Sequence, residues 1–288
     1  MTRTILVLGA SGKIGRHGAQ AFEAAGWKVK RYDRETGDMI AAARGADVIL
    51  NGMNPPNYHD WKNTIPAITA QVIEAAEANG ATVIVPGNVY HFGDKPGVWS
   101  QDTPPAPVSR KGQIRLEMER TYKASDVQTI ILRAGNFIDP NRQDCPMSAI
   151  YLRSIKNDKV TLPGPASTRQ AMCYLPDWSR AAVQLAQMRN ELGHFEDIPF
   201  PGHTLTADEI KLGLESILNR KLRFVRFPWG IMRLLSPVWE LARELHEMRY
   251  LWNTDHALDG ARVKQLLPDF EPTQLKLVLS AALPKSAV

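Results

Sequence analysis

The N-terminal segment places three glycines directly between a short apolar run and an alanine-rich stretch. Residues 5–8 are apolar, Gly9, Gly12 and Gly15 follow at regular spacing, and the alanine-rich stretch continues to Gly26. Glycines so spaced allow a tight turn, close approach of a pyrophosphate, and close packing of a helix on a strand. The amides and positive dipole end of the helix then face the anion. The sequence therefore predicts a dinucleotide-binding turn.

Composition excludes several other classes of protein. Of the 288 residues, 44% are hydrophobic and 23% are charged, as is usual for a globular protein. The net charge of +5 comes from scattered basic residues, so we expect no nucleic-acid partner. The two cysteines, Cys145 and Cys173, form neither a disulfide framework nor a C-x-x-C motif. No apolar run reaches about 18 residues, and no signal segment is evident. We therefore expect a cytoplasmic protein with no membrane partner.

Strand and helix patterns alternate through the first half of the chain. Alternation of this kind predicts an α/β fold, a doubly wound parallel sheet with right-handed crossovers. The spacing after the second strand leaves room for only a very short third strand, or none. The expected strands are 3–8, 28–32, 47–50, 81–85 and 129–133, and the expected helices are 12–25, 38–44, 65–79 and 111–124.

The pattern loosens after Gly135, which suggests two lobes. We predict a dinucleotide-binding Rossmann domain over 1–135 and a smaller, mostly helical substrate lobe over 136–288. The helix at 177–189 should return to the first domain. The apolar, aromatic segment 227–239 is expected to pack against the first lobe or a partner subunit rather than on a membrane surface. A homodimer is therefore an open expectation.

Taken together, these features resemble the short-chain dehydrogenase/reductase superfamily. The extended or atypical branch, the NAD-dependent epimerase/dehydratase family, is the nearest match. Residues 9–15 fit its G-x-x-G-x-x-G spacing, and 45–49 resemble the strand that leads to the loop beside the cofactor. Residues 85–93 resemble the segment with the catalytic Ser/Thr, and 132–137 the strand end that leads to the substrate lobe. The resemblance implies an NAD(P)-dependent enzyme that acts on a small molecule.

The catalytic residues depart from the family pattern. Family members carry Tyr-x-x-x-Lys on a helix, where the lysine lowers the pKa of the phenol that shuttles a proton. In the matching stretch, Lys111 takes the Tyr position and Arg115 the Lys position, while Asn88 replaces the Ser/Thr. Lys111 could act as an acid or base beside Arg115, or the two could clamp an anion. Tyr90, two residues after Asn88, could supply a displaced phenol.

The resemblance also assigns cofactor contacts. The pyrophosphate is expected on the turn formed by Gly9, Ser11, Gly12, Lys13, Ile14 and Gly15. After the second strand, an acid favours NAD and an arginine favours NADP. Asp33 and Arg34 offer both, and we favour NADP on Arg34 while NAD stays open. Asn51, which opens the loop after strand 47–50, is also placed beside the cofactor. No metal-ligand spacing occurs among the seven histidines.

The proline-stiffened loop 51–61 follows a strand at the edge where ligands bind in such folds. Asn54, Tyr58 and Trp61 could therefore line a substrate pocket, or Trp61 could simply pack on the core.

Our leading hypothesis is an NAD(P)-dependent oxidoreductase, similar to nucleotide-sugar epimerases and dehydratases. It would move a hydride between the nicotinamide and a carbonyl or hydroxyl carbon of an unidentified small molecule. The lost Tyr-x-x-x-Lys motif motivates an alternative, a non-catalytic NAD(P)-binding redox sensor or regulatory protein. A lyase or isomerase that retains its cofactor is a third possibility.

Overall fold

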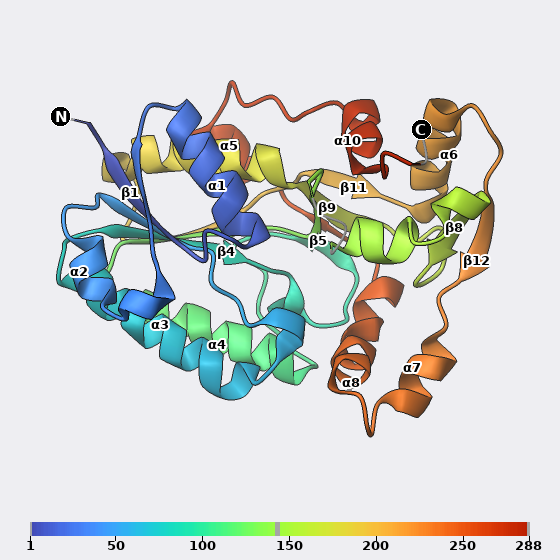
Figure 1. Cartoon of the computed structure of the whole chain (residues 1–288), viewed down its shortest axis with the longest axis horizontal. Helices are drawn as coiled ribbons and strands as arrows, with labels where there is room; N and C mark the ends of the chain where they lie inside the picture. The colour runs from blue at the N-terminus through green and yellow to red at the C-terminus, as the bar shows by residue number, and fades with distance from the viewer. Residues whose placement is uncertain (1, 142–144, 287–288) are drawn as a thin grey trace.

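A six-stranded parallel sheet forms the centre of the first lobe (Figure 1). The computed structural model describes residues 2–141 and 145–286. The strand order β10–β6–β4–β3–β1–β2 confirms the doubly wound fold that the alternating pattern predicts. The strands are β1 (Thr4–Leu8), β2 (Lys28–Arg31), β3 (Val48–Asn51), β4 (Thr82–Gly87), β6 (Thr129–Arg133) and β10 (Phe195–Pro199).

Helices cover both faces of this sheet (Figure 1). One face carries α1 and α5, which pack against each other, and the other carries α2, α3 and α4. Asp38 caps α2, as the sequence suggests, by accepting a hydrogen bond from the Ala41 amide at 2.8 Å. The bounds are α1 (Lys13–Ala24), α2 (Met39–Ala43), α3 (Trp61–Glu77), α4 (Arg110–Ala124) and α5 (Leu175–Gln187).

The strand order reverses at the carboxyl ends of β1 and β3. The chain leaves β1 to form β2 on one side, and returns to pair β3 with the other side of β1. Ligands bind at such a reversal because the two following loops diverge there. Within the described residues, β2 is the edge strand, and only a 3-10 turn and α2 separate it from β3. No strand between β2 and β3 in sequence extends the sheet beyond β2 in the described residues, so the expectation of a very short or missing strand after the second one is confirmed.

The second lobe holds more strand than the sequence pattern indicates, because its strands are too short to show alternation. They form small sheets in the orders β11–β9–β7, β12–β8 and β13–β5. Their bounds are β5 (Gly97–Trp99), β7 (Asn136–Ile138), β8 (Lys159–Leu162), β9 (Gln170–Tyr174), β11 (His203–Leu205), β12 (Arg223–Arg226) and β13 (His256–Leu258). The helices after α5 are α6 (Ala207–Leu218), α7 (Trp229–Leu235), α8 (Glu240–Glu247), α9 (Ala261–Leu266) and α10 (Leu275–Ala282).

Segments after residue 135 also lie with the first lobe, among them α9, whose Val263 packs in the core of that lobe. Helix α5, expected at 177–189, packs on α1, and β10 pairs with β6 at the edge of the sheet. The sequence pattern does not indicate β10, since Phe195–Pro199 shows neither alternation nor a continuous apolar run. The core of the first lobe therefore draws on residues from both halves of the chain.

The apolar segment 227–239 is only partly covered. Phe227 and Trp229 pack in the core of the second lobe. Leu234 and Val238, in contrast, are 78% and 85% exposed. Packing of the whole segment against the first lobe, one of the two expected arrangements, is therefore wrong within one chain, because α7 turns one face inward and leaves the other bare. Packing against a partner subunit stays a prediction.

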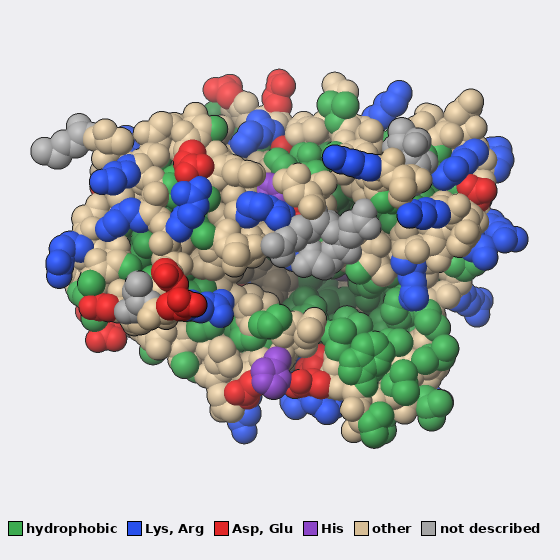
Figure 2. Space-filling view, in the orientation of Figure 1, with side chains coloured by type: hydrophobic (Ala, Val, Ile, Leu, Met, Phe, Trp, Pro, Cys, Tyr) green, Lys and Arg blue, Asp and Glu red, His purple; other side chains and the backbone are tan. Residues whose placement is uncertain are grey.

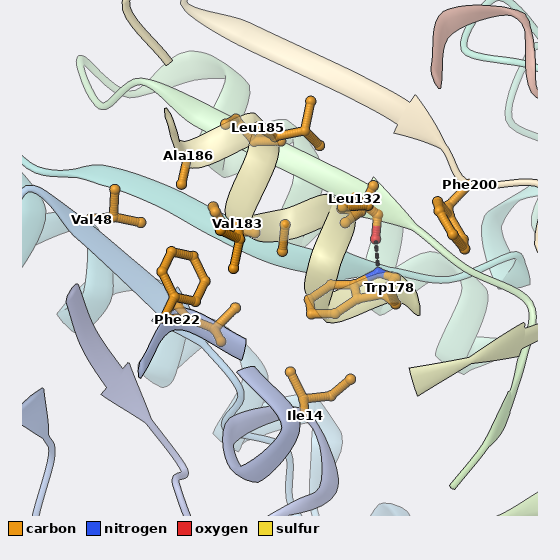
Figure 3. Packing of buried hydrophobic residues seen from close by; sticks show 14 of the residues in the cluster. Ile14, Phe22, Val48, Leu132, Trp178, Val183, Leu185, Ala186 and Phe200 are labelled. Atoms are coloured by element: carbon orange, nitrogen blue, oxygen red, sulfur yellow. Dashed lines mark hydrogen bonds between the residues drawn. The ribbon is translucent and has the colours of Figure 1, made fainter. Parts of the chain in front are cut away.

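We predict that Trp178→Ala lowers the free energy of unfolding by about 3–5 kcal/mol, the usual cost of emptying a large aromatic site. Trp178 is fully buried between α5 and the sheet, and its indole NH donates to the Leu132 carbonyl at 3.1 Å (Figure 3). Urea denaturation measures the change. The control is Trp239→Ala, at a tryptophan that is 45% exposed, where a change of similar size would contradict the assignment.

Candidate functional site

The glycine turn between β1 and α1 has the close approaches that a pyrophosphate cradle needs. Gly9 has φ +66°, and a Cβ there would lie 2.8 Å from the Gly52 carbonyl oxygen. A Cβ on Gly15 would lie 2.3 Å from the Gly9 oxygen. Helix α1 has no acid in its first turn, and Gly12 brings no side-chain cap, so its amides suit an anion. The side chain of Ile14 packs in the core.

The predicted adenosine-side residues lie at the end of β2. Asp33 and Arg34 are both exposed, and Asp33 Oδ1 accepts a hydrogen bond from the Glu35 amide at 3.0 Å. Asn51 is buried at the end of β3, and its amide nitrogen donates to the Tyr122 hydroxyl at 3.1 Å. That contact directs Asn51 towards α4, so its cofactor contact stays a prediction.

The segment after β4 carries Asn88 and Tyr90. The Asn88 side-chain oxygen accepts a hydrogen bond from the Tyr90 amide at 2.9 Å, which closes a local turn. The Asn88 oxygen, which would take the place of the family's Ser/Thr hydroxyl, is thus already hydrogen-bonded within the chain. The same bond fixes the backbone that carries the Tyr90 phenol.

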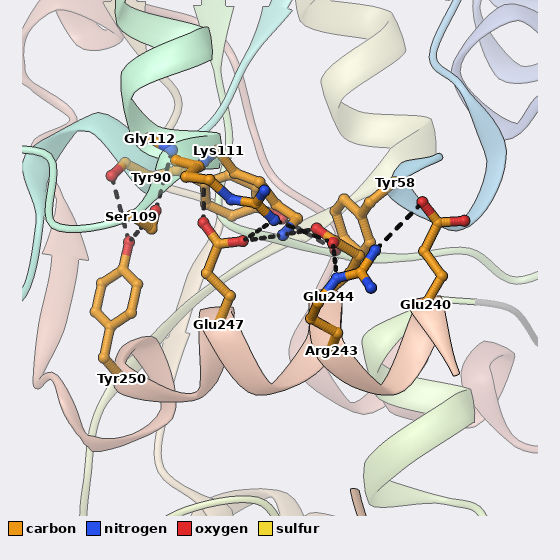
Figure 4. Close-up of polar contacts among 11 residues, drawn as sticks. Tyr58, Tyr90, Ser109, Lys111, Gly112, Glu240, Arg243, Glu244, Glu247 and Tyr250 are labelled. Carbon is orange, nitrogen blue, oxygen red and sulfur yellow. Dashed lines mark hydrogen bonds and ion pairs between the residues drawn. The ribbon is translucent and has the colours of Figure 1, made fainter. Parts of the chain in front are cut away.

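Lys111 lies in a buried ion-pair cluster between α4 and α8 (Figure 4). Its side chain is 2% exposed. Its ammonium contacts Glu244 and lies 2.6 Å from Glu247, whose other oxygen accepts from the Lys111 amide at 3.1 Å. Two carboxylates thus bind the cation that the sequence predicts in the family's tyrosine position. The exposed Arg110 adds a contact to Glu244 at 3.2 Å.

Sequence reasoning missed Glu244 and Glu247. They lie three residues apart on one face of α8, and both point to α4 (Figure 4). Burial acts to raise the pKa of Glu244, but its hydrogen bond to Lys111 and the charge of that ammonium bring the pKa below the usual 4.5. Nothing in the sequence links α8 to α4, because more than a hundred residues separate them.

Arg115 is buried but has no carboxylate partner among the described residues. One guanidinium nitrogen donates to the Asn54 side-chain oxygen at 2.7 Å, and the group lies 4.6 Å over the Trp61 ring. Its Nε is buried without a hydrogen-bond partner. Burial lowers the pKa of Arg115. Among the nearby groups that raise this pKa, Tyr90 has the largest effect. Arg115 therefore retains capacity for an oxygen-bearing ligand.

Two phenols meet beside Arg115. The hydroxyls of Tyr58 and Tyr90 lie 3.3 Å apart, and the Tyr90 ring stacks on Trp61. Tyr90 and burial raise the pKa of Tyr58 well above 10. Tyr58 thus keeps its proton and can donate to Tyr90. The φ angles of Asn57, Tyr58 and Asp60 are positive, a costly conformation for side-chain-bearing residues that often marks a functional site.

Arg133, fully buried at the end of β6, joins the surrounding elements. It pairs with Glu119 of α4 at 2.8 Å and with Asp197 of β10 at 2.6 Å, and donates to the Asn88 carbonyl. It also lies 3.1 Å from Nδ1 of His91. Burial and the charge of Arg133 lower the pKa of His91 to about 3, so this ring is neutral and structural.

The structure thus brings Tyr90 and Arg115 together with the loop residues Asn54, Tyr58 and Trp61. It also reveals different surroundings for the two cations on α4. Lys111 is bound by carboxylates, whereas Arg115 faces aromatic rings and one amide. A phenol beside a cation is the arrangement that proton transfer to a reacting oxygen requires.

Comparison with known proteins identifies a family and a shared fold. The model of the NAD dependent epimerase/dehydratase family matches residues 5–198. No curated protein matches the sequence.

Solved structures share the fold over nearly the whole chain. MoeE5 in complex with UDP-glucose and NAD is 16% identical, with a TM-score of 0.75 over 97% of both chains. UDP-glucuronic acid 4-epimerase from Bacillus cereus in complex with NAD is 20% identical, with a TM-score of 0.75 over 96% of both chains. WbmH of Bordetella bronchiseptica in complex with NAD+ is 18% identical, with a TM-score of 0.72 over 98% of this chain and 97% of that one.

We predict that Glu244→Gln destabilises the fold at neutral pH by about 1–2 kcal/mol, less than a fully broken buried pair costs because Glu247 remains. The folded-state pKa of Glu244 is depressed, so its contribution is present above pH 4.5 and is lost as the pH falls through the folded value. Urea denaturation at several pH values should show the wild type and variant converging in acid.

The control for this prediction is Glu240→Gln at the start of α8. Glu240 is 43% exposed and pairs with His59, so its loss should change stability little. A difference between wild type and Glu244→Gln that stayed constant into acid would contradict the ion-pair assignment.

Proposed function

The chain belongs to the NAD dependent epimerase/dehydratase family, and from that premise we propose that it is an NAD(P)-dependent oxidoreductase. It moves a hydride between the nicotinamide and a carbonyl or hydroxyl carbon of a small molecule. The observation that carries the proposal is the Tyr90 phenol, held 3.3 Å from Tyr58 beside the buried Arg115. The glycine turn supports it, because added Cβ atoms would collide with the backbone of Gly52 and Gly9, so only glycine allows this tight strand-to-helix turn.

In this proposal Tyr90 is the proton shuttle. The nicotinamide supplies hydride transfer when bound. Tyr90, as a phenolate, would take the hydroxyl proton of a substrate carbinol and become a phenol, and in the reverse direction the phenol would return that proton to the carbonyl oxygen. A phenolate on Tyr90 would lie beside the Arg115 guanidinium and accept a hydrogen bond from Tyr58. Tyr90 thus takes over the task that the family gives to the tyrosine on the helix.

Lys111 and Asn88 are positioning residues in this scheme. Lys111 holds α8 through Glu244 and Glu247, and its ammonium lies 5.1 Å from the centre of the Tyr58 ring. Asn88 fixes the turn that carries Tyr90. The sequence predicts Lys111 and Asn88 as catalytic residues. In this proposal they instead position Tyr58 and Tyr90, and Tyr90 is the catalytic residue.

The substrates we propose are nucleotide sugars. MoeE5 is in complex with UDP-glucose, and the similar UDP-glucuronic acid 4-epimerase from Bacillus cereus is in complex with UDP-glucuronic acid. In this chain, the unsatisfied Nε of Arg115 is a donor for an oxygen of such a substrate or of the cofactor ribose. UDP-sugars are therefore the first compounds to incubate with the protein and NAD or NADP.

The cofactor choice rests on Asp33 and Arg34. NAD is the cofactor named for the three similar structures described above, and they give no support for NADP. Both selector residues are exposed after β2 in this chain. We propose NAD(P) as the cofactor class, with Arg34 as the residue that would admit a 2′-phosphate.

A second candidate is a non-catalytic NAD(P)-binding sensor. Two observations favour it: carboxylates bind the cation in the tyrosine position, and the Asn88 side chain is engaged by its own backbone. This candidate predicts cofactor binding with no hydride exchange for any UDP-sugar.

We predict that Tyr90→Phe lowers kcat by about a hundredfold or more, the usual loss of a general acid–base group. Cofactor affinity should be unchanged, because only the hydroxyl is removed. The rate is measured as reduced nicotinamide formed, or as epimerised sugar released, with whichever UDP-sugar turns over.

Tyr58→Phe is the matched control, since it removes the hydrogen-bond partner and keeps the Tyr90 phenol. Its loss should be smaller than that of Tyr90→Phe. Full activity in Tyr90→Phe would exclude the proposed shuttle, and absence of turnover in the wild type with intact cofactor binding would favour the sensor.

For cofactor choice, we predict that Arg34→Ala weakens NADPH binding about tenfold while NADH binding changes little, because only NADPH carries the phosphate that an arginine pairs with. Titration of nicotinamide fluorescence measures both. Asp33→Ala is the reciprocal variant and should weaken NADH. Equal weakening of both cofactors by Arg34→Ala would contradict a selector role.

A further inference from the structure

Four large apolar side chains are exposed together where α7 turns into α8. They form what we call the α7–α8 corner: Ile231, Leu234, Val238 and Trp239, exposed by 54%, 78%, 85% and 45%. Figure 1 shows α7 and α8 projecting at the lower edge of the second lobe, and Figure 2 shows hydrophobic side chains gathered over the same region. Exposed apolar clusters of this kind mark interaction sites.

The chain around this corner is strongly basic. Residues 216–239 contain five basic side chains and no Asp or Glu: Arg220, Lys221, Arg223, Arg226 and Arg233. Arg220 pairs with Asp158. Arg226 and Arg233 are exposed and form no ion pair with any residue that the structure describes. Arg233 lies on α7 itself, and Arg226 ends β12, the strand that leads into α7, so the corner adjoins two exposed arginines without an ion-pair partner among the described residues.

The acids of the neighbouring helix face the other way. Glu240, the first residue of α8, pairs with His59, and Glu244 and Glu247 bind Lys111. The carboxylates of α8 are therefore directed towards the first lobe, and they leave the positive charge of Arg226 and Arg233 unopposed at the corner.

We propose that the α7–α8 corner docks on an anionic lipid bilayer. Peripheral binding of this type combines insertion of apolar side chains into the boundary of the acyl chains with attraction of Lys and Arg to anionic head groups. Trp239 suits this boundary, where indole rings are enriched. None of the helices in residues 2–141 and 145–286 has the length and apolar composition of a membrane-spanning segment.

A second copy of the chain fits the corner less well. In a two-fold symmetric contact each corner meets its own copy, which would bring the same unpaired arginines together. Like charges brought together this way oppose association. A bilayer with anionic head groups supplies both the apolar interior and the missing negative charge.

The test is co-sedimentation with vesicles of phosphatidylcholine, with or without phosphatidylglycerol. We expect the wild type to sediment with the phosphatidylglycerol vesicles, to stay in solution with phosphatidylcholine alone, and to bind less at higher salt. The variant Leu234→Ser/Val238→Ser should lower the partition coefficient about tenfold or more, since it removes the methyl groups that would be buried in the bilayer. Arg226→Gln/Arg233→Gln should lower it as well.

The matched control is Leu212→Ser/Leu277→Ser, at two leucines that are 62% and 58% exposed on α6 and α10. It should bind like the wild type, and unchanged thermal unfolding would confirm that each variant folds. Equal loss in this control, or a wild type that binds neither vesicle, would overturn the proposal. So would a dimer in solution that Leu234→Ser/Val238→Ser converts to a monomer, because the corner would then be a contact between copies.

Discussion

The candidate site depends on one buried cation, Arg133 at the end of β6. Its guanidinium binds Glu119 of α4, Asp197 of β10 and the Asn88 carbonyl, and so ties together three elements that are distant in sequence. Removing one partner of such a buried pair costs about 3–5 kcal/mol, because a charge is left without compensation. The position of the Tyr90 phenol relative to α4 follows from these contacts.

The two cations of α4 carry the same charge but have different binding partners. Lys111 and Arg115 lie one turn apart and are both buried, yet carboxylates bind only the first. A lysine is a compact charge that two acids can surround, whereas a guanidinium can lie on an aromatic face and still direct its N–H groups elsewhere. Arg115 does this over Trp61, with its Nε unsatisfied. We therefore assign ligand binding, in our proposal, to Arg115 rather than to Lys111.

Local signals explain what the sequence could predict. The glycine turn, the alternation of strands and helices and the short connection after β2 each follow from contiguous residues, and the structure has all three. The loop 51–61 was recognised by its prolines and its place after a strand. The contact of α8 with Lys111 could not be predicted, since it joins residues more than a hundred positions apart. The strand β10 was not predicted, because its five residues show no alternation of apolar and polar side chains.

Helix α8 connects the two surfaces on which the proposals rest. Its acids bind Lys111 at the candidate site, and the residue before its first turn is Trp239 of the α7–α8 corner. A bilayer could shift α8 only if it bound one position of the helix more tightly than another. Because Glu244 and Glu247 are anchored on buried Lys111, any such movement must first separate these charges. The ion pair therefore favours a corner that docks as a rigid unit, with the site kept assembled at the membrane.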